Sequence, residues 1–260
     1  MDKLNIKNKI ILVCGGSGQV GRSIIKYLLN KKAIIINFDI NTAKNISDKN
    51  YLFLNTNLTN EKTVKKNVKK ISKIYGKIDG MVNLFHYKGN NKRLDNNHSF
   101  FNSFENYSFS NWKKVINVNL NGLFLISKYV IKEMKKNKKG TIVNFSSTYG
   151  VRSPKHNIYG KSKINSPIAY ATTKSAIINF SRYLSTYYGK DNIRVNVVSP
   201  GGIETKGQSK EFKENYNLNT PMQRLAKDYE FNEIIHVLLS DASSYMTGAN
   251  ISVDGGWTAW

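Results

Sequence analysis

The sequence predicts an α/β protein, with helices on both faces of a doubly wound parallel sheet of about seven strands. Short runs rich in Ile and Val recur along the 260-residue chain, and longer stretches with apolar residues at helical spacing separate them. This alternation is typical of a parallel sheet that is covered on both faces. Neither a break in composition nor an internal repeat interrupts it, so we expect a single domain over residues 1–260.

The strands are predicted from runs of β-branched residues, and the helices from apolar residues that recur every three or four positions. Val20, Ile24 and Leu28, for example, fall on one helix face. We expect strands at Lys9–Cys14, Ala33–Phe38, Tyr51–Leu54, Ile78–Leu84, Thr141–Phe145, Ile193–Val198 and Asn250–Val253. We expect helices at Gln19–Asn30, Glu61–Tyr75, Trp112–Lys136, Ala169–Tyr188 and Asp228–Leu239. Two long loops remain, at Phe85–Ser110 and Tyr149–Pro167, and such loops usually have a function or move.

Composition limits the class of protein. The chain contains 40% hydrophobic residues, which is enough for a sizeable core. It has no apolar run of about 18 residues, so we expect no membrane-spanning helix. Cys14 is the single cysteine and permits no intrachain disulfide, which fits a reducing compartment such as the cytoplasm.

The net charge of +23 allows two interpretations. The charge could serve to bind a polyanion, such as nucleic acid or a membrane surface. Alternatively, it reflects a drift of composition, because Lys, Asn and Ile are abundant throughout the chain. Basic pairs such as Lys65-Lys66 and Lys69-Lys70 recur at helical spacing, as on a solvated helix face. We therefore favour drift and expect neither a nucleic-acid nor a membrane partner, although a phosphate-bearing small substrate would gain from the positive field.

A glycine-rich turn follows the first predicted strand and opens the first predicted helix. Glycine stands at every third position, at Gly15, Gly18 and Gly21. The first glycine allows a tight turn, the second lets the backbone approach a pyrophosphate, and the third lets helix and strand pack closely. The helix amino terminus also directs free N–H groups at such an anion. We therefore expect a dinucleotide to bind at Gly15, Ser17, Gly18, Gln19, Val20 and Gly21.

Asp39 follows the second predicted strand, 18 residues after Gly21. A carboxylate there accepts hydrogen bonds from ribose hydroxyls and repels a 2′-phosphate, which favours NAD over NADP as the cofactor. Arg22 lies beside the glycine-rich turn, so NADP stays an alternative cofactor. Asp39 could instead cap the segment that follows, where Asn41 and Thr42 stand.

Tyr170 and Lys174 lie four residues apart in a predicted helix, so both side chains share one face. An ammonium close to a phenol stabilises the phenolate and lowers the pKa of the tyrosine, which makes Tyr170 a candidate general acid/base for a carbonyl/alcohol pair. Ser147 and Pro200–Thr205 each closely follow a predicted strand. Because ligands of parallel sheets bind at the carboxyl ends of the strands, we expect these residues to converge there with the glycine-rich turn.

From Lys9 to Trp257 this combination of motifs resembles the short-chain dehydrogenase/reductase family, whose members have a single-domain Rossmann fold. The resemblance implies an oxidoreductase that transfers hydride between a nicotinamide cofactor and a secondary alcohol or ketone. It implies a catalytic tetrad in which Ser147 holds the substrate oxygen, Tyr170 transfers the proton, Lys174 binds the nicotinamide ribose and Asn119 supports a water relay. It implies further cofactor contacts at Asn57, Leu58, Asn83, Pro200, Gly201, Ile203 and Thr205. Family members commonly form dimers or tetramers, so we expect a homodimer or a homotetramer.

The chain departs from the family pattern at several positions. Cys14 replaces the usual threonine before the glycine-rich turn, and Asn57 stands where the family usually has an aspartate. The usual Asn-Asn-Ala-Gly is here Asn83-Leu84-Phe85-His86, which changes the packing expected around the adenosine.

An insertion at 151–167 makes the stretch before Tyr170 about twice as long as in the family. Within it, Tyr159 and Lys163 form another Tyr/Lys pair at the same spacing. Gly160 disfavours a helix there, and no apolar helical pattern follows, so we assign the later pair as catalytic.

The insertion, the Ser-Ser-x-Tyr-Gly sequence at 146–150 and the Ser-Pro-Gly-Gly-Ile turn at 199–203 resemble the flagellin-modification subgroup, which is associated with bacterial surface-sugar pathways. This implies a sugar or nucleotide-sugar substrate for surface glycan biosynthesis, with or without a phosphate, beneath a cationic loop. Two other functions stay open: a nucleotide-sugar epimerase or dehydratase with tightly bound NAD, and a non-catalytic scaffold for NAD or nucleic acid. His86, His98 and His156 lack the spaced partners of a metal site, so we expect no metal.

Overall fold

The computed structural model describes residues 2–43, 45–87, 89, 99–162 and 164–260. Within these residues, seven parallel strands form one sheet in the order β3-β2-β1-β4-β5-β6-β7. The strands are β1 (Ile10–Cys14), β2 (Ile34–Asp39), β3 (Tyr51–Asn55), β4 (Gly80–Asn83), β5 (Gly140–Phe145), β6 (Ile193–Pro200) and β7 (Asn250–Val253). The predicted fold class is confirmed.

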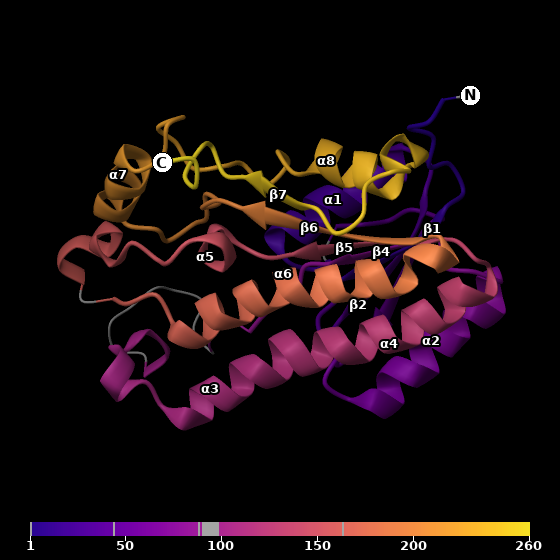
Figure 1. Cartoon of the computed structure of the whole chain (residues 1–260), viewed down its shortest axis with the longest axis horizontal. Coiled ribbons are helices and arrows are strands. Elements are labelled where there is room, and N and C mark those ends of the chain that lie inside the picture. Colours follow the sequence, from indigo (N-terminus) through magenta and orange to yellow (C-terminus); the bar gives the residue numbers. More distant parts are fainter. Residues whose placement is uncertain (1, 44, 88, 90–98, 163) are drawn as a thin grey trace.

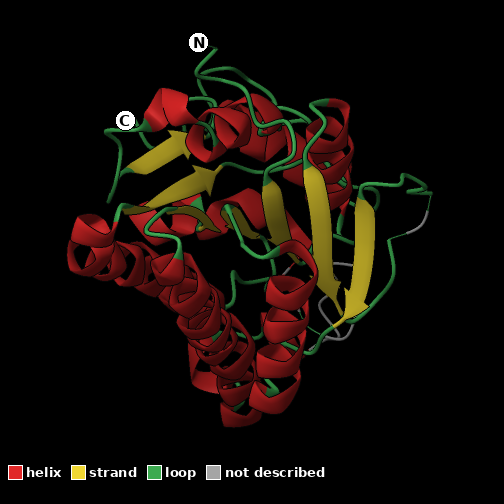
Figure 2. Cartoon of the chain, turned by 90° about the vertical axis from the view of Figure 1, so that its right-hand side faces the viewer, coloured by secondary structure: helices red, strands yellow, loops and turns green. Residues whose placement is uncertain are grey.

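Helices cover both faces of this sheet (Figure 1, Figure 2). Two lie on one face, α1 (Gln19–Asn30) and α8 (Asn232–Leu239), and three on the other, α2 (Glu61–Tyr75), α4 (Gly122–Lys136) and α6 (Ile168–Tyr188). Along β1, Leu12 packs in the core beneath α2 and α4, whereas Val13 packs in the core beneath α1 and α8. Because alternate side chains enter opposite cores, the central strands are apolar at nearly every position.

The bounds of all seven strands lie within two residues of the prediction, and α1 and α2 have the predicted bounds. The predicted helix Trp112–Lys136 consists of α3 (Phe109–Ile116) and α4, joined by one π-helical turn at Asn117–Asn121. The prediction of a helix from Asp228 is wrong at its start, because the chain forms turns up to Phe231 and α8 begins at Asn232.

Two helices were not predicted: α5 (Thr148–Val151) and α7 (Lys210–Leu218). Both lie at the end of the molecule to which the tips of β6 and β7 point (Figure 1). α7 is mostly polar and buries only Tyr216, so its sequence lacks an apolar stripe. No helix of the described chain combines the length and the apolar character that crossing a membrane requires.

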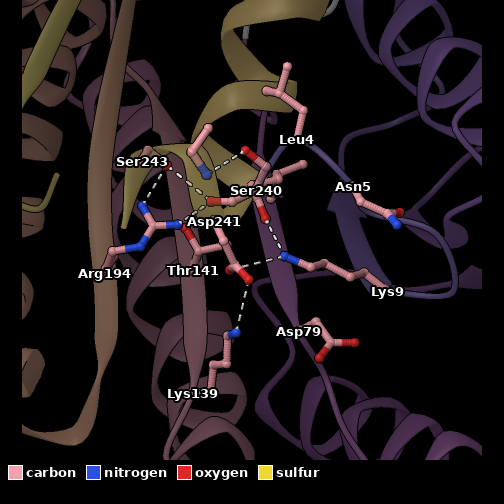
Figure 3. A network of polar contacts seen from close by, with 12 residues as sticks. Leu4, Asn5, Lys9, Asp79, Lys139, Thr141, Arg194, Ser240, Asp241 and Ser243 are labelled. Atoms are coloured by element: carbon pink, nitrogen blue, oxygen red, sulfur yellow. Dashed lines mark hydrogen bonds and ion pairs between the residues drawn. The ribbon is translucent and has the colours of Figure 1, made fainter. Parts of the chain in front are cut away.

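At the opposite, amino-terminal edge of the sheet, Arg194 of β6 holds the carboxyl end of α8 (Figure 3). Its guanidinium donates hydrogen bonds of 2.9–3.3 Å to the hydroxyl of Ser243 and to the carbonyl oxygens of Leu238, Ser240 and Met246. Carbonyls at a helix end have no N–H partner in the helix, so a side chain that donates several bonds is needed there. Burial lowers the pKa of Arg194, and Asp241 opposes that shift.

We predict that Arg194→Lys lowers the free energy of unfolding by about 2 kcal/mol, because a single ammonium cannot replace a forked donor and leaves buried carbonyls unpaired. Urea unfolding followed by circular dichroism measures the change. Arg152→Lys, at an exposed site, is the matched control and should cost less than about 0.5 kcal/mol. Equal losses in the two variants would contradict the role assigned to Arg194.

Candidate active site

The glycine-rich turn lies where β1 leads into α1, at the carboxyl edge of the sheet. Gly15 has a φ of +79°, in the left-handed region that L side chains rarely adopt. A Cβ on Gly21 would lie 2.6 Å from the Cα of Gly16, so α1 packs directly on the turn. A Cβ on Gly18 would meet, among the described residues, only the Gly15 carbonyl oxygen at 3.5 Å. The turn is therefore closely packed on one side and open over the start of the helix.

The amino end of α1 fits the pyrophosphate of a nicotinamide dinucleotide. Gly18 is the cap of this helix and has no side-chain oxygen to occupy the first N–H groups. The space over Gly18 admits a phosphate, and the helix dipole favours negative charge at that place. Ser17, Gln19 and Val20 complete this part of the predicted cofactor site and are half-buried.

Asp39 is fixed beside the glycine-rich turn at the end of β2. Its carboxylate accepts hydrogen bonds from the backbone N–H groups of Ser17 at 3.0 Å and of Asn41 at 3.1 Å. The guanidinium of Arg22 donates to the carbonyl oxygen of Ser17 at 2.7 Å. The turn thus carries a fixed negative charge on one side and a positive charge on the other.

The turn after β6 contacts the glycine-rich turn. Gln19 donates from its side-chain amide to the carbonyl oxygen of Glu204 at 3.0 Å. The predicted cofactor residues at the end of β6 and on this second turn are Pro200, Gly201, Ile203 and Thr205. Of these, Thr205 is exposed and donates its backbone N–H to the side chain of Gln208 at 2.9 Å. The structure therefore brings the two predicted cofactor segments together at one edge.

Asn57, Leu58 and Asn83 lie after β3 and at the end of β4. The side-chain oxygen of Asn57 accepts a hydrogen bond from the N–H of Thr59 at 3.0 Å, and Leu58 is buried. Asn83 donates to the side chain of Asn144 at 2.7 Å, while its own Oδ1 is buried and has no partner among the described residues. A buried oxygen without a partner is costly, so this atom suits an N–H or O–H group of a bound molecule.

Ser147, Tyr170 and Lys174 meet between the end of β5 and α6. A hydrogen bond from the Ser147 hydroxyl to Tyr170 lowers the pKa of the tyrosine. The amine of Lys174 donates to the carbonyl oxygen of Phe145, the last residue of β5, at 2.8 Å. The same amine lies 5.5 Å from the centre of the Tyr170 ring. Three of the four predicted catalytic side chains are thus neighbours.

Burial dominates the electrostatics of this group. It lowers the pKa of Lys174 to about 7, because the charged amine loses its hydration. It also raises the pKa of Tyr170, which the hydrogen bond from Ser147 opposes only in part. The pKa of Tyr170 is therefore raised where the sequence led us to expect it lowered, because burial of the phenol outweighs the hydrogen bond from Ser147.

Asn119, the fourth predicted catalytic residue, lies in the π-helical turn before α4. Its buried side chain accepts a hydrogen bond from the backbone N–H of Tyr87 at 2.8 Å and donates to the hydroxyl of Thr173 at 2.9 Å. Thr173 precedes Lys174 on α6. Asn119 therefore joins the segment after β4 to the helix that carries Tyr170 and Lys174.

Two further residues, Asn37 and His86, touch this region, and the sequence did not predict this position for either. Asn37, fully buried in β2, accepts a hydrogen bond from the N–H of Gly16 at 3.1 Å and donates to the Ser17 hydroxyl at 3.1 Å. A polar residue inside the apolar run of β2 was the available signal. The ring of His86, which the sequence suggested only as a rejected metal ligand, lies 5.7 Å from the ring of Tyr170, edge to face.

The 151–167 segment contains a 3-10 helix at His156–Ser162, interrupted at Gly160, where φ is +56°. Tyr159 therefore does not stand on an α-helix, whereas Tyr170 lies in the first turn of α6, as predicted. Lys163 lies outside the described residues, as does His98. Among the described residues, no three His, Cys, Asp or Glu side chains are grouped to hold a metal ion.

Comparison with known proteins agrees with this geometry. A family model described as enoyl-(acyl carrier protein) reductase matches residues 20–258. Post-translational flagellin modification protein A of Campylobacter coli is 29% identical over 97% of this chain and 99% of its own length. Sorbitol-6-phosphate 2-dehydrogenase of Klebsiella pneumoniae is 29% identical over 98% of both proteins. A short-chain dehydrogenase of Leptospira borgpetersenii, solved with bound NAD+, has a TM-score of 0.89 and 33% identity, and the match covers 98% of this chain and 94% of that one.

We predict that raising the pH from about 7 to about 9 stabilises the protein, relative to Lys174→Met, by about 2 kcal/mol. Lys174 has a pKa of about 7 in the folded chain and 10.5 as its ordinary value. Between these values the unfolded chain binds more protons, so stability rises with pH across that window. Methionine has a similar length and does not titrate. Urea unfolding of both proteins at both pH values gives the difference; a difference that does not change with pH would mean that the buried amine stays charged.

Proposed function

Because this chain belongs to the short-chain dehydrogenase/reductase family, we propose that it is an NAD-dependent oxidoreductase that interconverts a secondary alcohol and a ketone on a sugar or nucleotide-sugar. Membership confirms the resemblance that the sequence motifs carry. Enzymes of the family oxidise CH–OH groups, or reduce the corresponding carbonyl groups, with a nicotinamide cofactor. We propose in addition that the enzyme prefers NAD to NADP, that its substrate is sugar-like, and that individual residues have the roles given below.

One observation carries the proposal. The hydroxyls of Tyr170 and Ser147 and the amine of Lys174 come together at the end of β5, on the same edge of the sheet as the glycine-rich turn. A pure binding protein needs no phenol and amine beside a hydroxyl in this arrangement. A proton carrier next to a dinucleotide site is what alcohol oxidation requires.

In the proposed mechanism, Tyr170 takes the proton from the substrate alcohol during oxidation and returns it to the ketone oxygen during reduction. Ser147 donates a hydrogen bond to the substrate oxygen and holds it close to Tyr170. Lys174 holds the nicotinamide ribose and, when protonated, stabilises the phenolate. Asn119 supports the path of the proton to solvent by holding α6 through Thr173. A bound nicotinamide supplies the hydride exchange.

For the cofactor, we propose that the glycine-rich turn holds the pyrophosphate and that Asp39 accepts hydrogen bonds from the adenosine ribose. Asn57 contacts the adenine, and Ile203 and Thr205 hold the nicotinamide carboxamide. Further contacts come from Leu58, Asn83, Pro200 and Gly201. NAD is favoured over NADP because the fixed Asp39 carboxylate repels a 2′-phosphate, while Arg22 points to the Ser17 carbonyl oxygen.

A sugar-like substrate is supported by the names of two relatives, a flagellin modification protein and a sorbitol-6-phosphate dehydrogenase. The 151–167 segment adds positive charge, since Arg152, Lys155 and Lys161 are all exposed on it. Such a cationic loop favours a phosphorylated or nucleotide-linked sugar. Surface glycan biosynthesis is the pathway class that we propose.

We also propose a homodimer or homotetramer that forms through α4 and α6, which lie side by side on one face of the molecule (Figure 1). Phe124 on α4 and Tyr183 and Tyr187 on α6 are more than half exposed. Large aromatic side chains are enriched in protein interfaces. A cytoplasmic location and the lack of a nucleic-acid partner stay predictions.

We predict that Tyr170→Phe lowers kcat/KM by about 10³-fold, since general acid/base catalysis is lost. The NAD dissociation constant should change by less than about threefold, because the ring and its packing are kept. A screen of sugars, polyols and nucleotide-sugars with NAD, followed at 340 nm, finds the substrate, and fluorescence titration gives cofactor binding.

Unaltered turnover in Tyr170→Phe would overturn the assignment of the proton carrier. In the same screen, sugar conversion without net NADH would indicate an epimerase or dehydratase. Turnover of an acyl thioester in place of any sugar would refute the proposed substrate class.

We predict that Asp39→Asn lowers the ratio of kcat/KM for NAD to that for NADP by about tenfold. The amide no longer repels a 2′-phosphate but still accepts a hydrogen bond. Initial rates with the two cofactors give the ratio, and Asp48→Asn, outside the cofactor site, is the control. An unchanged ratio in both variants would mean that Asp39 does not determine the preference for NAD over NADP.

A further inference from the structure

A groove of about 510 Å³ lies at the amino edge of the sheet, opposite the candidate active site. Because β1, β4, β5 and β6 are neighbours and run in parallel, the residues that precede them gather at this edge. Those that immediately precede these strands and line the groove are Lys9, Asp79, Lys139 and Asn192. The other walls come from the start of the chain and from the segment that follows α8. The lining contains none of the proposed catalytic or cofactor residues.

The charged side chains that line this groove are mostly basic. The positive ones are Lys3, Lys9, Lys77, Lys139 and Arg194, and the negative ones are Asp79 and Asp241. Five positive charges against two negative ones give the lining a net charge of +3. A concave surface lined by one sign of charge focuses the electric field and concentrates ions of the opposite sign. The groove therefore favours an anion.

The carboxylates neutralise the lysines of the groove only in part. Asp241 accepts hydrogen bonds from both Lys9 at 3.4 Å and Lys139 at 3.3 Å (Figure 3). Both bonds are longer than the distance of about 2.8 Å that is usual for charged partners. Asp79 is paired with Lys77 at 3.0 Å. Two ammonium groups that share one carboxylate at these distances keep positive charge for a further anion.

The cations of the groove differ in how firmly the protein holds them. The side chain of Lys9 is only 19% exposed, and its amine also donates to the carbonyl oxygen of Leu239 at 3.2 Å. Lys139 and Lys77 are 59% and 48% exposed, so their amines can turn toward a bound anion. Arg194 adds its charge, while its donors serve the end of α8. One cation is thus fixed in advance, which lowers the entropic cost of binding.

We propose that this groove is a second anion site, which binds the diphosphate group of a small molecule. A diphosphate that is free or terminal on a nucleoside carries a charge of about −3 near neutral pH, which matches the lining. Lysine binds phosphate as a point charge and needs no fixed orientation. Lys9, Lys77 and Lys139 precede three neighbouring strands, so their amines can surround two adjoining phosphates. The volume lies within the usual range of small-molecule pockets, about 300–1,000 Å³.

The test is a calorimetric titration of inorganic pyrophosphate into the NADH-loaded protein at about 0.1 M ionic strength. We expect saturable binding at one site per chain. The fluorescence of bound NADH should stay unchanged, because the ligand occupies a groove at the other edge of the sheet. Orthophosphate should bind at least about fivefold more weakly, since it brings less charge to the same amines.

Two substitutions in the groove should change the affinity in opposite directions. Lys139→Gln should raise the Kd for pyrophosphate about fivefold, because one of the exposed amines is lost. Asp241→Asn should lower the Kd about fivefold, because it frees the amines of Lys9 and Lys139 and removes a repelling charge. The matched controls are Lys69→Gln and Asp48→Asn, which make the same changes of charge at exposed sites outside the groove. Each control should change the Kd by less than about twofold.

The outcomes separate a built site from the general positive charge of the chain. Absence of saturable binding, or release of NADH by pyrophosphate, overturns the proposal. Equal effects of the groove variants and their controls also overturn it, because the anion then responds only to net charge. An orthophosphate Kd as low as that of pyrophosphate contradicts the assignment of a diphosphate.

Uridine diphosphate, titrated in the same way, distinguishes the two sources of the diphosphate group. Tighter binding than that of pyrophosphate assigns a nucleotide to the groove, and equal or weaker binding assigns the free anion; both results keep the site. None of these measurements depends on turnover, so failure of this inference leaves the proposed dehydrogenase function in place.

Discussion

The hydrogen bond from the Lys174 amine to the Phe145 carbonyl oxygen fixes the geometry of the candidate active site. It joins α6 to the last residue of β5 at 2.8 Å, and the Ser146 hydroxyl donates to the Lys174 carbonyl oxygen at 2.7 Å. Two bonds between one residue and the end of a strand keep the helix from sliding along the sheet. Tyr170 consequently stays beside the serine that follows the strand. The same burial disfavours the charged amine, so the site gains its geometry at the expense of stability near neutral pH.

The residues of the candidate active site and a network of residues that stabilises the fold lie at opposite edges of the parallel sheet. At the carboxyl edge lie the open glycine-rich turn, the fixed Asp39 carboxylate and the buried Asn83 oxygen without a partner. At the amino edge, Arg194 satisfies the carbonyls at the end of α8, and Asp241 accepts hydrogen bonds from Lys9 and Lys139 at 3.4 and 3.3 Å (Figure 3). An open turn and a buried oxygen without a partner at the carboxyl edge are what a ligand site on this fold requires.

The sequence predicted those elements whose apolar residues follow one period, such as the strands, α1 and α2. It did not predict α7, because that helix is polar and packs through a few aromatic side chains. The π-helical turn was missed because it shifts the helical register without interrupting the helix. For the site, motif spacing identified the residues that meet at β5. It could not give the direction of the Tyr170 pKa shift, since burial depends on contacts far apart in the chain.

A crystal structure of the protein with bound NAD tests the central claim most directly. We predict that the pyrophosphate lies on the amino end of α1 and that the nicotinamide ring lies beside the hydroxyls of Tyr170 and Ser147. A nicotinamide ring on another part of the surface, or a Tyr170 hydroxyl turned away from it, would contradict the assignment of this edge of the sheet as the active site.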